Sequence, residues 1–67
     1  MKITLKVTGK KPQKIKIKNS STVHDILKKL DLKPDMYIAN RNGEFIPLDK
    51  QLCDGDNLIL LAVASGG

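Results

Sequence analysis

The stretch DGDNLILLAVASGG, residues 54–67, decides the fold of this chain. It consists of a polar turn, an apolar run from Leu58 to Ala64, and two glycines at its end. A short apolar run that follows turn residues predicts a buried β-strand. Because this run is more continuously apolar than the two strand candidates near the N-terminus, we expect it to be a central strand with neighbours on both sides.

Length and composition limit what the chain can be. Its 67 residues have room for one domain, which we place at residues 1–65, with residues 66–67 as a flexible tail. A domain of this size buries roughly 60% of the surface of its unfolded chain, so a catalytic cleft walled by several layers is excluded. The single cysteine, Cys53, excludes an intramolecular disulfide and indicates a reducing compartment. We expect it to pack near the adjoining turn.

No secretion signal or membrane segment is visible in the sequence. Residues 1–6 alternate between polar and apolar side chains, and no apolar run approaches the ~20 residues that a membrane span needs. We therefore expect a cytoplasmic monomer that does not contact a membrane.

The first half of the chain predicts a hairpin followed by a helix. Residues 2–8 and 13–18 alternate between aliphatic and mainly lysine side chains, which is the period of half-buried strands. Residues 19–22 are helix-capping types, and Asp25 follows where a carboxylate favours the first-turn amides. Four apolar residues then recur at helical spacing, namely Val23, Ile26, Leu27 and Leu30. We expect the helix to end by residues 31–33, because Pro34 disfavours helical geometry in the residue before it.

Shorter elements connect the helix to the closing strand. Residues 36–39 are a short strand candidate, residues 41–43 a tight turn, and residues 44–46 a return strand that Pro47 ends or confines to a sheet edge. Residues 48–52 are expected to be irregular, with two leucines anchored in the core. The helix between the first two strands and the last allows the last strand to pair parallel to the first. The order predicts an α+β fold of the β-grasp (ubiquitin-like) type, a mixed sheet of about four to five strands with one helix packed across one face.

Over nearly its whole length the chain resembles the ubiquitin-like sulfur carriers of the ThiS and MoaD type, and the related small archaeal modifier proteins and ubiquitin-related modifiers. Residues 22–30 are similar to the family's helix, residues 42–47 to its middle hairpin, and residues 54–64 to its last strand. Gly66-Gly67 is similar to the family's reactive diglycine tail. Ala64-Ser65 precede the glycines where relatives vary, and the family pattern does not require so basic a hairpin.

The resemblance implies that the chain is a substrate of other enzymes and not itself a catalyst. An E1-like enzyme uses ATP to adenylate the terminal carboxylate, here that of Gly67, and the chain itself needs no bound cofactor. A persulfide donor protein then supplies sulfur to give a thiocarboxylate, or the acyl group passes to a lysine. Gly66 and Gly67 suit this because a backbone without Cβ atoms can thread a narrow channel and leaves the acyl carbon open to attack.

The destination of the activated carboxyl stays open at this point. As a sulfur carrier, the chain would serve an acceptor enzyme in thiamine thiazole, molybdopterin or thiolated tRNA synthesis. As a modifier, it would form isopeptide bonds with substrate lysines.

The closing strand also indicates where the activating enzyme binds. If Leu58 and Leu60 face the helix, strand alternation places a row of three apolar residues on the opposite face, namely Ile59, Leu61 and Val63. An apolar row on an open face often marks a contact site. We predict that this row docks on the activating enzyme. The alternative is that the chain's own loops cover it.

Other patterns are weaker signs of function. His24 has no cysteine or serine placed as a nucleophilic partner, so we expect a surface residue and not a catalytic one. Asp54 and Asp56 flank a glycine, which is typical of a turn, whereas a metal site needs more ligands.

The uneven charge suggests an alternative function. The net charge is +5, and the N-terminal hairpin predicts a basic face that includes Lys6, Lys14, Lys16 and Lys18. Such a face could bind nucleic acid such as tRNA, either as the main function or as a weak contact that accompanies sulfur transfer. Against the main role, the chain has one Tyr, one Phe and no Trp, and so lacks a stacking platform for bases.

Overall fold

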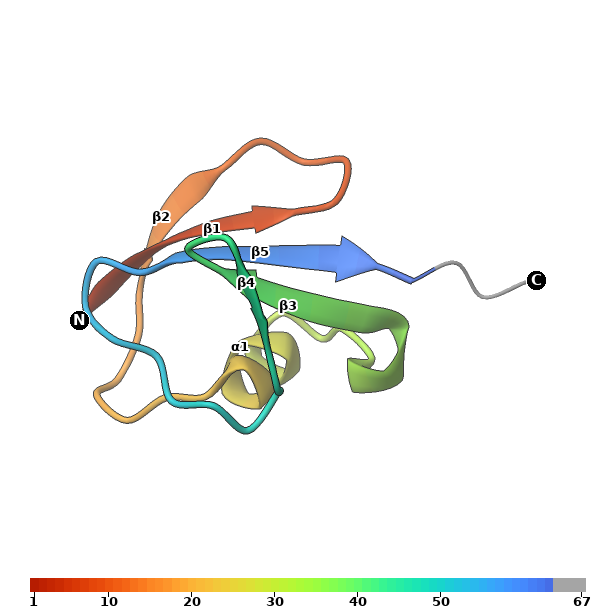
Figure 1. Cartoon of the computed structure of the whole chain (residues 1–67). Coiled ribbons are helices and arrows are strands. Elements are labelled where there is room, and N and C mark those ends of the chain that lie inside the picture. The colour runs from red at the N-terminus through yellow and green to blue at the C-terminus, as the bar shows by residue number, and fades with distance from the viewer. Residues whose placement is uncertain (64–67) are drawn as a thin grey trace.

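The structure is a computed structural model that describes residues 1–63. The elements follow one another as β1 (Lys2–Val7), β2 (Gln13–Lys16), α1 (Val23–Lys29), the 3-10 turn η1 (Pro34–Met36), β3 (Tyr37–Arg41), β4 (Glu44–Ile46) and β5 (Asn57–Ala62). The strands form one sheet in the order β2-β1-β5-β3-β4, and α1 lies across one face of it (Figure 1).

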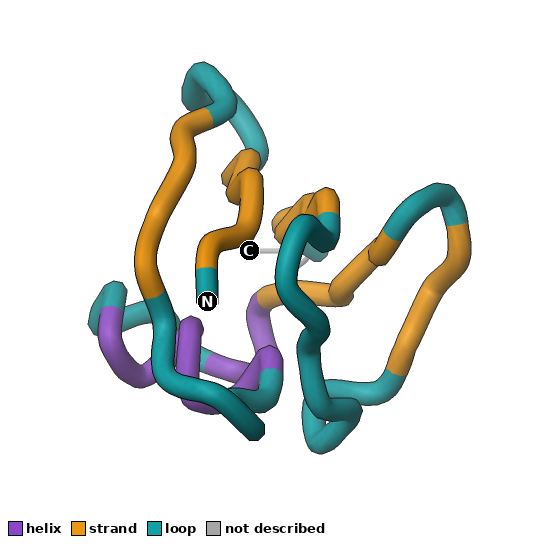
Figure 2. The backbone as a smooth tube through the Cα atoms, turned by 90° about the vertical axis from the view of Figure 1, so that its left-hand side faces the viewer, coloured by secondary structure: helices purple, strands orange, loops and turns teal. Residues whose placement is uncertain are grey.

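The closing strand β5 is central, as the sequence predicts. It pairs parallel to β1, with Leu5 beside Leu58, and antiparallel to β3, with Ala39 beside Leu60. The α+β β-grasp architecture with a mixed sheet is therefore confirmed. Figure 2 shows the helical segments gathered on one side of the strands. Among residues 1–63, no helix covers the other face of the sheet.

The N-terminal hairpin has the predicted pairing but a shorter second strand. Ile3 lies opposite Ile15 with both side chains toward the core. β2 ends at Lys16, two residues before the alternation does, because Ser21 donates hydrogen bonds to the Lys18 carbonyl from both its amide (3.2 Å) and its hydroxyl (2.6 Å). This turn removes Lys18 from the ladder and leads the chain into the helix.

The helix begins and ends where local chemistry directs it. The Asp25 amide donates to Thr22 Oγ1 (3.2 Å), and the Thr22 amide donates to Asp25 Oδ2 (2.9 Å), which is a capping box. The helix ends at Lys29, and the next turn closes through a bond from the Leu32 amide to the Leu27 carbonyl (2.8 Å). The predicted end before Pro34 is therefore confirmed.

The middle hairpin differs from the expected boundaries by one or two residues. β3 begins at Tyr37 and not at residue 36, because the Met36 amide bonds back to the Lys33 carbonyl (3.0 Å) within the η1 turn. It runs on to Arg41, because a two-residue turn at Asn42 and Gly43, with φ of 52° and 93°, keeps the strands paired up to their ends. β4 is an edge strand that ends just before Pro47, as predicted.

A single core lies between α1 and the sheet. Its buried residues are Ile3, Leu5, Val7, Ile17, Val23, Ile26, Leu27, Ala39, Leu52, Leu58 and Leu60. The expected anchoring of Leu48 and Leu52 is observed, since Leu52 is buried and Leu48 packs against the cluster. Residues 1–63 contain no helix with the length and hydrophobicity of a membrane span.

Cys53 corrects one expectation. Its side chain is exposed, whereas the sequence predicted a packed one. The reason is that the backbone of this residue makes the contact, since its amide donates a 2.7 Å bond to Asp56 Oδ2.

Candidate functional site

The two faces of β5 carry apolar side chains in different surroundings. Leu58 and Leu60 are 1% and 0% exposed and lie in the core beneath the helix. Ile59 and Leu61 alternate with them, point to the outer face of the sheet and are half-buried. Val63, just beyond the strand, is half-buried too. The predicted orientation of the strand is therefore present, although neighbouring side chains on the sheet partly cover the outer row.

The sheet adds two apolar residues to this outer face that sequence reasoning missed. Ile38 lies directly beside Leu61, and Phe45 lies beside Asn40, which is in turn the neighbour of Ile59. Ile38 and Phe45 are the exposed large apolar side chains among the described residues, at 42% and 66%. Four residues thus form what we call the apolar patch, namely Ile38, Phe45, Ile59 and Leu61. Alternation within each strand could have placed these residues on the outer face, but only the strand register shows that they are neighbours.

The end of β5 is held on both sides. The Thr8 hydroxyl donates to the Leu60 carbonyl (3.0 Å) and accepts from the Ala62 amide (2.9 Å). A side chain thus extends the parallel ladder beyond the last residue of β1. On the other edge, the Val63 amide donates to the Met36 carbonyl (2.9 Å). These bonds define the point from which the chain continues toward residues 64–67.

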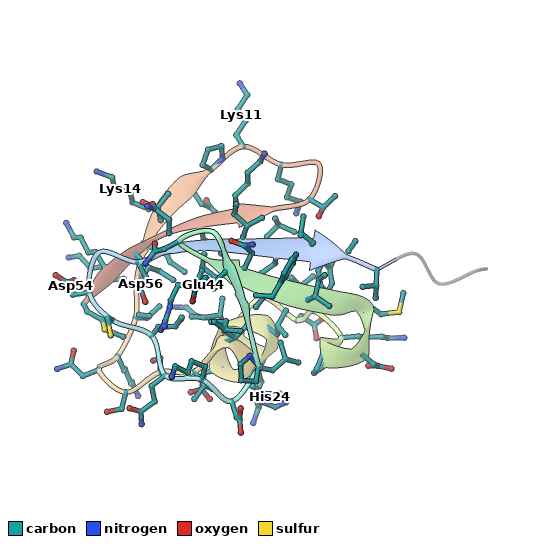
Figure 3. All side chains as sticks on the ribbon, viewed as in Figure 1. Lys11, Lys14, His24, Glu44, Asp54 and Asp56 are labelled. Carbon is teal, nitrogen blue, oxygen red and sulfur yellow. The ribbon has the colours of Figure 1, made fainter. Side chains whose placement is uncertain are left out.

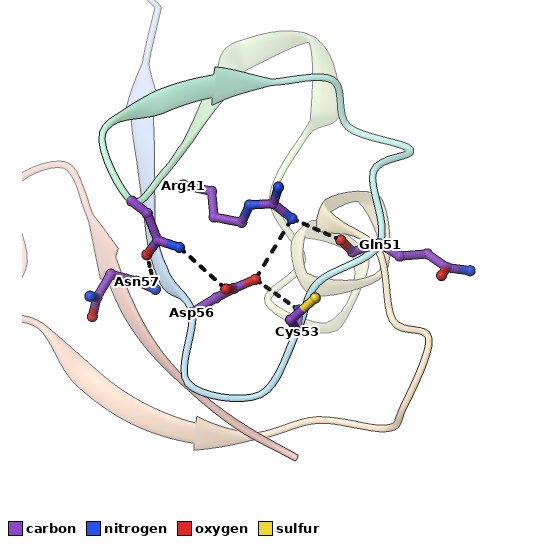
Figure 4. Close-up of polar contacts among 6 residues, drawn as sticks. Arg41, Gln51, Cys53, Asp56 and Asn57 are labelled. Carbon is purple, nitrogen blue, oxygen red and sulfur yellow. Dashed lines mark hydrogen bonds and ion pairs between the residues drawn. The ribbon is translucent and has the colours of Figure 1, made fainter.

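The beginning of β5 is held by a polar network around Asp56 (Figure 4). Asp56 is 7% exposed, and its carboxylate accepts hydrogen bonds from the Cys53 amide (2.7 Å) and from Asn42 Nδ2 (3.4 Å). Arg41 Nη1 lies 3.8 Å from Asp56 Oδ2 and donates to the Gln51 carbonyl (3.1 Å). Asp56 therefore joins the turn before β5 to the turn between β3 and β4.

The hydrogen bonds of Asp54 and Asp56 stabilise the turn before β5. Asp54 Oδ1 accepts from the Lys2 amide (2.8 Å), and the Gly55 amide donates to the Lys2 carbonyl (2.8 Å). Within residues 1–63, His, Cys, Asp and Glu side chains form no group of three or more that could hold a metal ion. His24 is exposed at the start of α1, as expected from the sequence.

A group of four lysines occupies the other half of the outer face. In the hairpin register Lys2 lies opposite Lys16, and Lys14 lies opposite Thr4, midway between Lys2 and Lys6. All four side chains are exposed, and we call Lys2, Lys6, Lys14 and Lys16 the lysine quartet. In Figure 3 Lys14 extends from β2 away from the helix, beside which His24 lies. Lys18, which the sequence placed in this face, lies in the turn that leads to α1.

Comparison with known proteins assigns this chain to a family. The model of the ThiS family matches residues 4–67. The chain belongs to the ThiS family. Sulfur carrier protein TtuB of Thermus thermophilus is 27% identical to it over 67 residues, which is 100% of both chains.

Solved structures share the fold of this ThiS-family chain. SAMP1 from Haloferax volcanii matches with a TM-score of 0.73 and 24% identity over 100% of both chains. The ubiquitin of Caldiarchaeum subterraneum matches with a TM-score of 0.74 and 23% identity, over 100% of this chain and 98% of that one. At such identities the similarity establishes a ubiquitin-like β-grasp fold.

Membership of the ThiS family supports the prediction that this protein is a carrier. Proteins of this kind are small carriers and not catalysts. That other enzymes act on this chain remains a prediction. The predicted reactive residues, Gly66 and Gly67, fall within the family match but lie outside the described residues. Their role, and the docking role of the row on β5, remain predictions.

Proposed function

We propose that this protein is a ubiquitin-like sulfur carrier or modifier whose Gly67 carboxylate is activated by a separate E1-like enzyme. The observation that carries the proposal is the match to the ThiS family, which extends from residue 4 through Gly67 and so includes both glycines. The relative named a sulfur carrier aligns over its whole length, which supports the same function.

The proposed reaction begins at the Gly67 carboxylate. A carboxylate oxygen attacks the α-phosphorus of ATP, and pyrophosphate leaves. A persulfide sulfur of a donor protein then attacks the acyl carbon, and AMP leaves. A second thiol attacks the donor's own sulfur in the resulting acyl disulfide, which forms a disulfide on the donor side and releases the thiocarboxylate. In the modifier role, a lysine amine takes the acyl group instead.

The described part of the chain would supply binding and positioning. In this proposal the apolar patch and Val63 bind the activating enzyme, because half-exposed apolar side chains on an uncovered sheet face gain by being removed from water. The bonds from Thr8 and Met36 hold the end of β5. The tail therefore begins at a fixed distance from the bound surface.

The activation step can be tested with a cognate E1-like adenylating enzyme. We expect ATP–pyrophosphate exchange that depends on this protein and disappears when Gly66 and Gly67 are deleted. Since β5 ends at Ala62, before these residues in the chain, the deletion variant should keep the unfolding midpoint of the parent. Exchange that continues after the deletion would reject the proposed site of activation.

The docking surface is tested by Ile59→Asp in the same assay. A buried carboxylate at the interface should raise the KM for the carrier strongly, because an unpaired charge would be desolvated. Asn19→Asp is a matched control, since it adds the same charge at an exposed position before the helix. Equal KM values for the two folded variants would argue against docking through β5.

Intact mass spectrometry of the protein from its native cells separates the two roles. A mass gain of one oxygen-to-sulfur exchange at the C-terminus indicates the carrier, and a ladder of larger conjugates indicates the modifier.

A further inference from the structure

The lysine quartet is a charged surface that the proposed activation chemistry does not use. Lys2 and Lys16 are directly opposite each other in an antiparallel pair, and Lys14 is diagonal to both Lys2 and Lys6. Like charges in these positions repel each other and destabilise a sheet. Within residues 1–63 the salt bridge of the structure joins Arg41 to Asp56, and no lysine ammonium of the quartet forms one. The carboxylate of Asp54 contacts the quartet only through the backbone amide of Lys2 (2.8 Å).

Protection of the sheet edge explains only half of this arrangement. Lysines on an edge strand oppose the addition of further strands, which accounts for Lys14 and Lys16 on β2. Lys2 and Lys6, however, lie on β1, which has β2 on one side and β5 on the other. An interior strand needs no such protection. Lys2 and Lys6 lie on the solvated face, where polar residues are expected, but edge protection does not account for a positive charge at both positions.

The quartet and the apolar patch belong to one continuous surface. Lys6 is the direct neighbour of Ile59 across the parallel pair of β1 and β5, and Ile59 is followed across the sheet by Asn40 and then Phe45. The uncovered face is thus basic over β2 and β1, and apolar over β5, β3 and β4. A partner that covers the apolar half must come close to the basic half.

We infer that the lysine quartet is the second half of the docking face, and that its partner is a protein with carboxylates beside the apolar surface that receives Ile59 and Leu61. The inference rests on the proposed function, in which that apolar surface belongs to the activating enzyme. Carboxylates opposite the quartet relieve its internal repulsion, so binding becomes selective for partners of this charge. Opposite charges also guide the two proteins together before contact and raise the association rate.

The composition of the whole face favours a protein over a nucleic acid as the occupant. A phosphate backbone would neutralise the lysines. A nucleic acid, however, has no apolar surface that could cover aliphatic residues such as Ile38 and Leu61. Its bases could stack on one aromatic side chain of this face, that of Phe45 on the edge strand β4. An acidic rim beside an apolar centre matches both halves.

Charge reversal on β2 tests the inference. The variant Lys14→Glu/Lys16→Glu is compared with Lys28→Glu/Lys33→Glu, which makes the same charge change at exposed positions on the helix side. Association with the E1-like enzyme is measured by stopped flow at about 50 mM and about 300 mM NaCl, which spans strong and weak screening. We expect the β2 variant to associate about tenfold or more slowly at low salt and to lose most of the salt dependence. The helix-side variant should stay within about twofold of the parent.

A second variant guards against misfolding. Lys14→Gln/Lys16→Gln removes charge without adding acid, and should associate more slowly while its thermal midpoint stays equal or rises, because repulsion between Lys2 and Lys16 is relieved. If both β2 variants associate like the helix-side control, the inference is wrong.

The outcomes distinguish failure of this inference from failure of the docking surface in the proposed function. Loss of binding in Ile59→Asp with unchanged β2 variants overturns the quartet's role and leaves docking through β5 intact. If the β2 variants associate slowly while Ile59→Asp associates like the parent, the quartet binds the enzyme and docking through Ile59 is rejected. Tight binding of labelled tRNA that the β2 variants lose, with unchanged enzyme binding, overturns the inference in favour of a nucleic-acid surface.

Discussion

The two faces of β5 place similar side chains in opposite situations. Leu60 is 0% exposed and lies under α1 with Leu58, whereas Leu61, the next residue, is half-buried on the face that no helix of residues 1–63 covers. Both are leucines on one central strand. The inner face therefore supplies most of the stability, while the outer face leaves apolar area that the other residues of 1–63 only partly cover.

The largest expected effect tests this difference directly. Leu60→Ala should lower the free energy of unfolding by about 2–5 kcal/mol, because it leaves a cavity in a fully packed core. Leu61→Ala should cost about 1 kcal/mol, in proportion to the part of the side chain that is buried. Denaturant unfolding of both variants measures the two values. Equal losses would mean that the outer face contributes to folding as much as the core does.

The second prediction concerns the network that maintains the register of β5. Asp56→Ala should cost about 1–3 kcal/mol, because it leaves the Cys53 amide and Asn42 without their acceptor. Amide exchange at residue 53 should accelerate more than exchange in the centre of β1. A register shift of one residue would exchange the two faces of the strand. If Asp56→Ala exposed Leu60 and buried Leu61, the network would be what determines which face is which.

The third prediction concerns the other end of the strand. Thr8→Val keeps the shape of the side chain but removes the hydroxyl that bonds Leu60 and Ala62, so we expect a loss of about 0.5–1.5 kcal/mol. Exchange of the Ala62 amide should accelerate, and Thr8→Ser, which retains the hydroxyl, should restore protection. If Ser and Val behave alike, the side chain does not extend the ladder.

The smallest expected effect concerns the helix that separates the two faces. A hydrogen bond from the Thr22 backbone, and a second with its side chain, hold the pKa of the Asp25 carboxyl below its ordinary value of 3.8. Since the folded pKa is lowered, the carboxylate stabilises the fold fully above the ordinary value and loses this effect as pH falls through the folded pKa.

Comparison with Asp25→Asn measures this effect. The variant should be less stable than the parent at neutral pH, and thermal unfolding at decreasing pH should bring the two midpoints together. A constant difference down to the lowest pH would show that the charge of Asp25 does not support the helix.

Patterns that act between near neighbours in the sequence predicted the local elements of the fold. The capping residues Thr22 and Asp25, the turn at Asn42 and Gly43, and the alternation around Leu60 act between near neighbours in the chain, so their patterns predicted the helix, the hairpins and the inner row correctly. Lys18 was assigned to the basic face because alternation alone does not reveal where a strand ends. Cys53 was predicted to pack, but its side chain is exposed, and the hydrogen bond to Asp56 comes from its backbone amide.

By itself, the sequence determined the kinds of element, their order and the side of each strand that faces the core, since these depend on periodicity and local hydrogen bonding. Only the tertiary structure decided which outward side chains become neighbours. It set Ile38 beside Leu61, Lys2 opposite Lys16 and the Thr8 hydroxyl against the end of β5. A period of two assigns a residue to a face but contains no information on strand order or register, which follow from packing the whole sheet against one helix.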